Sequence, residues 1–406
     1  MSTIKYIMFL LTALTVFSCS KMNDVHQEYL DRGETVYAAK VDSIIVRTGN
    51  KRAQLDLYYS INRIKKCVIY WNVRNDSLVV DLPAPNPNGH SVILNNLSEG
   101  SYAFEIFTVD GSNNRSLVVE TSGRVYGDNY AISLANANIT NAEFVNGAAE
   151  IEWAVSVGDN GIVAVQGRYQ DKDNVQHDTT LLISSGASGK TIIRDFLKGS
   201  KFEYRTLYQP TPLSLDVFYT EYRLRSVRAD VTSDYMRNYS YPFARAGWDN
   251  NRWGSLQDWI INDAMKTRGG NQYGGYDHYQ DSETFGFERW GSGEGQILNG
   301  KIYQTATLPE GKYQFTFSYG GACPVPSNNG SNPRFLTANA GTSLPDVDQI
   351  SSSLAFTSLV GVGTGSSKTI EFTLTRETEV SLGIVVYFDG IEQNIRGSYF
   401  QLYKVE

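Results

Sequence analysis

The chain has 406 residues, a formal net charge of −7 and a pI near 5.3. Its length suffices for two to four domains of ordinary size. The acidic balance argues against nucleic acid and anionic membrane surfaces as partners. The three cysteines have no zinc or iron–sulfur spacing. Composition alone therefore indicates an acidic multidomain protein without a recognisable metal motif.

The first 18 residues have the features of a secretion signal. Lys5 precedes an uncharged apolar run at residues 7–17, which is too short to cross a bilayer but suits a signal-peptide core. The run ends in VFSC, which resembles the lipobox of bacterial lipoproteins, although its phenylalanine is bulkier than the commonest residue there. We expect Cys19 to be lipidated and to provide the only membrane attachment; a secretion signal with an incidental cysteine is the alternative. Ser20, where inner-membrane lipoproteins often carry Asp, favours the outer membrane.

The remaining chain predicts β-strands almost throughout. Apolar residues alternate with polar ones at 54–59, 313–319 and 380–386, and turns rich in Gly, Asn, Ser and Pro separate such segments. One short helix is expected within residues 255–267, ending before two glycines. Many short strands with frequent turns are typical of β-sandwiches, so the predicted fold class is all-β.

A weak internal repeat indicates two similar modules. Residues 92–108 resemble residues 191–207 at an offset of 99 positions, which is close to the length of one seven-stranded sandwich. Each copy also has one tryptophan in an apolar strand, Trp71 and Trp153, and we expect both to fill a core. Tandem fibronectin type III-like modules are the predicted arrangement.

Longer phrases carry a resemblance to a known family. The segments YLDRGETVYAAKVDSIIVRTGNKRAQL, VIYWN, NDSLVV, GRVYGDNYAISL and YRTLYQPTPLSLDVFYTEY resemble an uncharacterised family of Bacteroidetes lipoproteins over about residues 29–225. The later segments DWIINDA, GGYD, FERW and LNGKIYQTATLPEGKYQFTFSYGG resemble the galactose-binding-like jelly roll commonly attached to that family.

The expected domain organisation combines the signal, the repeat and this resemblance. It comprises a lipoprotein signal peptide at 1–18, a lipidated N-terminus and linker at 19–35, fibronectin type III-like modules at 36–126 and 130–230, and a jelly-roll domain at 240–406.

The resemblance also implies a function. Such chains are similar to surface glycan-binding lipoproteins of polysaccharide-utilisation systems, which capture polysaccharide beside an outer-membrane transporter. It implies a non-catalytic, lipid-anchored protein of the outer membrane that is exposed at the cell surface and binds polysaccharide or oligosaccharide. The alternative is a spacer or protein-binding lipoprotein that contacts a transporter or an assembly partner.

Catalytic motifs are missing from the sequence. The four histidines are scattered, and neither a nucleophile elbow nor a phosphate-binding loop is present. A glycoside hydrolase would need two carboxyl groups flanking the scissile bond, and the candidates are Asp277, Asp281, Glu283, Glu288 and Glu294. Solvated or hydrogen-bonded carboxylates are the favoured interpretation. No cofactor is expected; calcium is common in jelly rolls, but no acidic loop can be assigned to it.

Four of the six tryptophans lie between positions 248 and 290, among glycines, asparagines and tyrosines. A sugar site needs an aromatic plane with a few polar groups that fix orientation. Trp248 and Trp253 are predicted to form an exposed platform, whereas Trp259 beside two isoleucines is expected in the core. The remaining candidate binding residues are Tyr273, Tyr276, Asp277 and Trp290.

Overall fold

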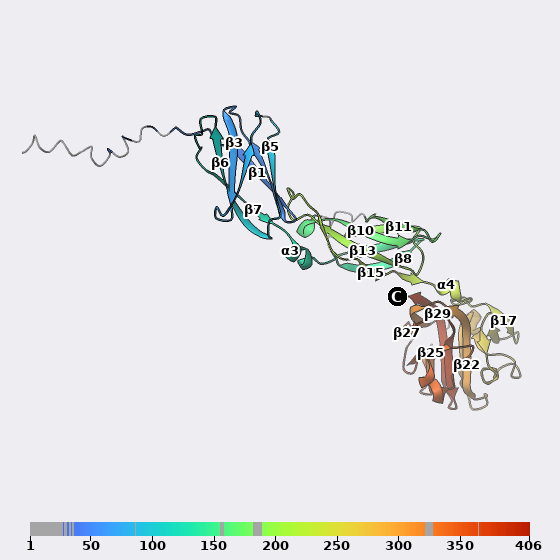
Figure 1. The fold of residues 1–406 in the computed structure, drawn as a ribbon. Helices are drawn as coiled ribbons and strands as arrows, with labels where there is room; N and C mark the ends of the chain where they lie inside the picture. The colour runs from blue at the N-terminus through green and yellow to red at the C-terminus, as the bar shows by residue number, and fades with distance from the viewer. Residues whose placement is uncertain are drawn as a thin grey trace, which may run out of the picture. The chain divides into compact units, whose positions relative to one another are not determined.

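The computed structural model describes residues 27, 31, 34, 36–85, 87–154, 158–181, 189–320, 328–363 and 365–406 (Figure 1). The expected signal sequence and the lipidation site Cys19 lie outside these residues, as does Cys323. Strands dominate the described chain and are grouped into sandwich-forming sheets, so the predicted all-β class is confirmed.

The chain divides into two compact units. One comprises residues 1–134 together with 208–219, and the other comprises residues 135–207 together with 220–406.

The first unit contains a sandwich of a three-stranded sheet, β1-β2-β5, and a four-stranded sheet, β4-β3-β6-β7. Seven strands in two sheets match the predicted fibronectin type III-like module. Cys67 lies in its core as a free thiol, and burial raises the pKa of that thiol to about 12. The strands are β1 Ser43–Gly49, β2 Arg52–Tyr58, β3 Ile64–Trp71, β4 Asp76–Asp81, β5 His90–Asn95, β6 Gly100–Asp110 and β7 Val119–Val125.

A distant segment completes the first unit. Residues 208–219, here called the strap, contact the rest of the first unit through an ion pair, an aromatic cluster and hydrogen bonds that include one from the Leu215 N–H to the Thr48 carbonyl oxygen. The Arg52 guanidinium donates to both carboxylate oxygens of Asp216, at 3.0 and 2.5 Å. The Phe218 ring meets that of Tyr130 edge-on, with 5.0 Å between centroids. The strap therefore belongs structurally to the first unit, although the last strand of the first module ends at Val125 and the strap begins only at Tyr208.

The second module also has two sheets. One has the order β12-β9-β8, and the other contains β11-β10-β13 with β15 paired to β13 (green in Figure 1). The strands are β8 Ile139–Val145, β9 Ala148–Trp153, β10 Ile162–Gln170, β11 Gln176–Leu181, β12 Gly189–Arg194, β13 Lys201–Tyr208 and β15 Arg223–Ser226; the strap ends in β14, Phe218–Tyr219.

The internal repeat corresponds to equivalent strands. Shifted by the predicted 99 positions, β5 coincides with β12. Leu97 and Phe196, which the repeat aligns, are both buried in their respective cores. Trp153 is also a core residue, as predicted, whereas Trp71 is only partly buried and packs against the edge of its core. The repeated apolar pattern thus reports two copies of one packing arrangement.

The C-terminal domain is a larger sandwich. Its front sheet has the order β27-β23-β29-β21-β20-β18-β17, with β24 also paired to β29, and its back sheet has the order β19-β22-β28-β25-β26. The strands are β17 Arg245–Trp248, β18 Trp253–Leu256, β19 Ile260–Ile261, β20 Gly275–Asp277, β21 Thr284–Arg289, β22 Ile297–Leu308, β23 Gly311–Tyr319, β24 Asn328–Asn329, β25 Arg334–Ala340, β26 Ala355–Ser358, β27 Ser367–Leu374, β28 Thr378–Phe388 and β29 Gln393–Lys404.

The predicted alternation holds in this domain. The aromatic residues of 313–319 and the aliphatic residues of 380–386 are buried between the two sheets. The same core includes Val231 and Met236, which precede residue 240, the expected start of the domain. The stretch expected to link the second module to the jelly roll therefore packs into the C-terminal core.

The helix expected within 255–267 does not form. Strand β18 ends at Leu256, β19 covers Ile260–Ile261, and only a short 3-10 turn, Asp263–Met265, follows. Asp258 has a φ of +65°, which interrupts any helix, and β19 pairs with β22 in the back sheet. Sheet pairing thus overrides the local helical pattern.

Strand β16 (Arg228–Asp230) joins the second module to the C-terminal domain. It runs parallel to β8, pairing Arg228 with Glu143, and antiparallel to β29, pairing Ala229 with Lys404. One hydrogen-bonded sheet consequently continues from the second module into the front sheet.

Helices are short wherever the chain is described. They are α3 Asp128–Ser133 and α4 Thr232–Tyr235, with further 3-10 turns at Asp159–Gly161, Tyr279–Asp281 and Val347–Ser352. Within the described ranges, no helix has the length and apolar character needed to cross a membrane.

Candidate ligand-binding face of the C-terminal domain

The front sheet separates the two tryptophans that were expected to act together. Trp248 pairs with Gly254, so these two residues point to the same face of the sheet. Trp253 immediately precedes Gly254 in β18 and therefore points to the opposite face. Trp253 pairs with Asp277, and Gly254 pairs with Tyr276, which is a core residue. Trp253 and Asp277 therefore lie on the outer face of the front sheet, whereas Trp248 lies on the side of the core.

Trp248 is half-buried at the edge of the sheet. The Arg245 guanidinium lies 3.7 Å from the centre of its ring, and the His278 ring meets it edge-on at 5.2 Å. The turn after it is organised by Asp249, whose carboxylate accepts hydrogen bonds from three main-chain N–H groups, including that of Trp253. This side-chain capping holds the β17–β18 hairpin in one conformation.

Trp253 is held between charged groups on the outer face. Its ring lies 4.2 Å from the guanidinium carbon of Arg252 and 4.5 Å from that of Arg268. Cation–π contacts of this kind stabilise by about 0.5–2 kcal/mol each. The side chain is only 8% exposed. The Trp253 ring is thus covered by two arginine side chains of the protein itself.

A buried charge network lies beside Trp253. Arg252 donates to both oxygens of Asp277, at 2.7 and 3.0 Å, and approaches Glu288 at 3.1 Å. Arg396 binds the same two carboxylates, at 2.7 and 2.6 Å. Burial lowers the pKa of Arg252, but the hydrogen bond and charge of Asp277, followed by the charge of Glu288, outweigh it and raise the pKa. Two arginines and two carboxylates therefore neutralise one another.

The network leaves some polar atoms without partners. Nη1 of Arg396 and both side-chain amide atoms of Asn394 are buried without a hydrogen bond. Asn394 pairs with Glu288, so it faces outward from the sheet together with Arg396. Buried polar groups normally find a partner, so these atoms mark an unfilled hydrogen-bonding capacity at this face.

Trp290 is the exposed indole of this region. It directly follows β21, and 43% of its surface is exposed. Its main-chain N–H donates to Glu294, whose carboxylate also accepts from Arg268 at 2.8 Å. Burial raises the pKa of Glu294, but the Arg268 hydrogen bond and the main-chain N–H of Trp290 outweigh it and lower the pKa. The residue that carries the exposed indole is thus bonded through its main chain to an ionised pair.

The exposed platform predicted from the sequence needs correction. Trp253, Tyr276 and Asp277 are all buried, and Tyr276 belongs to the core, because strand pairing in the front sheet encloses them. Tyr273 is half-buried, with its ring against Gly269 in the preceding turn. Trp259 is in the core as expected, and its indole N–H donates to the Asn238 carbonyl oxygen.

The candidate carboxylates differ in their surroundings. Asp277, Glu288 and Glu294 are each paired with arginine. Asp281 is fully exposed and lies 3.5 Å from His278. A general acid for glycoside cleavage needs a raised pKa, whereas the pKa of Glu294 is lowered. Among the described residues, no group of three or more His, Cys, Asp or Glu side chains is arranged to hold a metal ion.

The sequence did not point to three arginines that contact the candidate residues. Arg245 and Arg268 contact the tryptophans, and Arg396 binds a carboxylate 119 positions earlier in the chain. Strand order in the front sheet brings Arg396 to Asp277, and no spacing in the sequence carries that information. Arg268 could have been chosen as a candidate from its local composition, because this residue immediately precedes two glycines of a turn.

Comparisons with known proteins identify domains without an assigned function. A family model described as a domain of unknown function (DUF4998) matches residues 19–218, and a second, also described as a domain of unknown function (DUF5013), matches residues 237–383. No curated protein matches the chain.

Solved structures with some likeness include two from chicken. The interferon gamma receptor alpha chain is 16% identical, with 47% of this chain and 98% of that chain covered and a TM-score of 0.21. A segment of two fibronectin type III domains from tenascin is 11% identical, with 47% and 99% covered and a TM-score of 0.20. The strand order of the two modules is itself that of fibronectin type III-like sandwiches.

Proposed function

We propose that the chain is a non-catalytic lipoprotein of the outer membrane that binds polysaccharide or oligosaccharide at the cell surface through its C-terminal domain. The observation that carries the proposal is the exposed Trp290 beside the Arg268–Glu294 pair. Sugars combine flat C–H surfaces with a rim of hydroxyl groups. An indole plane next to a fixed donor and a fixed acceptor complements both features.

The surrounding structure supports a rigid binding surface. The Trp253 ring contacts the guanidinium groups of both Arg252 and Arg268, and Asp277 and Glu294 hold these groups by ion pairs. A preorganised donor loses less conformational entropy when a ligand binds. The lowered pKa of Glu294 favours binding over hydrolysis at this pair, because a catalytic acid must be protonated at working pH.

The membrane part of the proposal depends on Cys19. Two or more acyl chains hold a protein stably at a membrane, since burying each methylene contributes about 0.8 kcal/mol. In this proposal the two fibronectin type III-like modules act as spacers between the lipid and the C-terminal domain, and a neighbouring transporter complex receives the captured glycan.

Affinity electrophoresis against a panel of neutral and acidic polysaccharides tests the proposal. At least one polysaccharide should retard the protein, and Trp290→Ala should reduce that retardation. Tyr37→Ala, which removes a similarly exposed ring from the first unit, serves as the matched control. If no polysaccharide retards the protein and soluble oligosaccharides leave its tryptophan fluorescence unchanged, the spacer or protein-binding function is favoured instead.

A further inference from the structure

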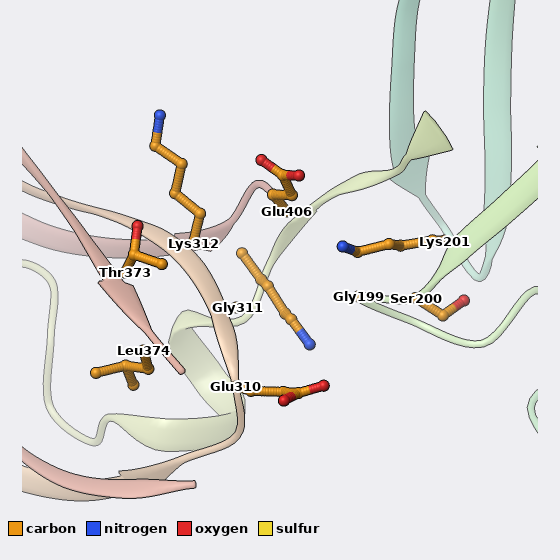
Figure 2. A pocket seen from close by; sticks show the side chains of 10 residues that line it. Gly199, Ser200, Lys201, Glu310, Gly311, Lys312, Thr373, Leu374 and Glu406 are labelled. Atoms are coloured by element: carbon orange, nitrogen blue, oxygen red, sulfur yellow. The ribbon is translucent and has the colours of Figure 1, made fainter. Parts of the chain in front are cut away.

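A cleft of about 420 Å³ lies where the second module meets the C-terminal domain. Gly199 comes from the turn before β13 and Lys201 from the start of β13, while the start of β23 and the end of β29 contribute Gly311 and Lys404. Both sides belong to the same compact unit. Figure 2 shows the side chains of Lys201 and Glu310 extending into this cleft from its two sides.

Two glycines make room for the Lys404 side chain. A methyl group added at Gly311 would lie 2.7 Å from Cε of Lys404, and one added at Gly199 would lie 3.3 Å from its Cδ. Both glycines have a positive φ, a conformation that other residues rarely adopt. The stem of Lys404 is therefore held between the two domains, with its ammonium group at the cleft.

Three lysines, Lys201, Lys312 and Lys404, border the cleft together with Glu310 and Glu406. Neither Lys201 nor Lys404 forms an ion pair with any residue in the described parts of the chain. Lys312, which also borders the cleft, is paired with Glu371 at 2.8 Å and points away in Figure 2. Burial lowers the pKa of Lys404, and the neighbouring charge of Lys201 lowers it further, while the charge of Glu310 raises it.

We propose that this lysine cleft binds a sugar acid, with the carboxylate between the ammonium groups of Lys201 and Lys404 and a hydroxyl group donating to Glu310. Two close ammonium groups repel each other, and a bound carboxylate relieves that repulsion. Glu310 would instead repel a simple anion, so the mixed charge favours a ligand that carries both a carboxylate and hydroxyl groups. The inference rests on the proposed function and specifies that the bound glycan contains sugar acids.

Chemical acetylation of the full chain, followed by mass spectrometry, tests the site directly. Glucuronate should slow acetylation of Lys201 and Lys404, and glucose should have no effect. Lys198 is the internal control because it is paired with Asp234 at 2.7 Å and does not border the cleft. Unchanged acetylation in glucuronate overturns the proposal, and equal protection by inorganic sulfate overturns its restriction to sugar acids.

Calorimetric titration with glucuronate provides a second measurement. Lys404→Met and Lys201→Met should each weaken binding about tenfold or more, the range expected for one charge-assisted hydrogen bond. Lys198→Met makes the same change of charge and should bind as the native chain does. Equal affinity in all three variants would place the carboxylate elsewhere.

The failures of this inference and of the proposed function are distinguishable. Neutral polysaccharide binding that depends on Trp290, without protection of the lysines by sugar acids, refutes the cleft and leaves the proposed function standing. Protection of the lysines by glucuronate, with no polysaccharide bound by the chain, supports the cleft and refutes the proposed function.

Discussion

Replacing Trp253 with alanine should destabilise the C-terminal domain, whereas replacing Trp290 should mainly weaken ligand binding. The two indoles differ in exposure, 8% against 43%. Truncating a buried aromatic side chain costs about 3–5 kcal/mol. The Trp253 variant also loses ring contacts to Arg252 and Arg268. For a domain of this size, about 2–4 °C per kcal/mol gives a fall in melting temperature of roughly 6–20 °C.

The expected pattern for Trp290→Ala is the reverse. Its exposed ring contributes less to the core, so the fall in melting temperature should be well below that of Trp253→Ala. Loss of one stacking ring should weaken polysaccharide binding by about 1–3 kcal/mol, by analogy with bases stacked on aromatic side chains. That corresponds to about 5- to 150-fold in affinity.

Both quantities should be measured on the same purified variants. Differential scanning calorimetry gives the melting temperature, and affinity electrophoresis gives the dissociation constant for any polysaccharide that binds. A native-like melting temperature for Trp253→Ala would refute the assignment of this ring to the folded framework. Unchanged affinity of Trp290→Ala, at unchanged stability, would refute its role in binding.

Three further outcomes are expected. Arg396→Met should lower the free energy of unfolding, measured in urea, by about 3–5 kcal/mol because it leaves buried carboxylates without one of their partners. The control Arg376→Met, on the surface, should change that free energy by less than about 0.5 kcal/mol. A Tm or urea midpoint equal in both variants would contradict the buried network. Asp216→Asn should expose the strap to proteolysis at neutral pH. In the native chain the hydrogen bond from Arg52 lowers the pKa of Asp216. The stabilisation by this ion pair is therefore complete above the ordinary carboxyl pKa and is lost as pH falls through the lowered value. Pepsin cleavage of the strap should rise only in strong acid, and cleavage independent of pH would contradict this ion pair. Cys19→Ala should move the protein from the outer-membrane fraction to the soluble periplasmic fraction, and continued sedimentation with the membrane would show another anchor.

Local pattern determined the class of the fold. Alternating apolar residues at 313–319 and 380–386 specify strands with one buried face, because successive side chains of a strand point to opposite sides. The offset of 99 positions predicted equivalent strands in the two modules, since the same core positions recur in each copy. These features depend on near neighbours in the chain, which the sequence displays directly. The burial of Trp259 followed in the same way from the two isoleucines beside it.

Tertiary structure alone decided which side chains meet. The expected platform failed because the pairing of Trp248 with Gly254 places Trp253 on the opposite face, and a register of this kind depends on strands from elsewhere in the chain. Arg396 reaches Asp277 only because β29 lies beside β21 in the front sheet. The strap and the lysine cleft likewise join segments that are distant in sequence. Sequence periodicity specifies which face of a strand is apolar, but strand order and register select the partners on that face, and those partners make the candidate site.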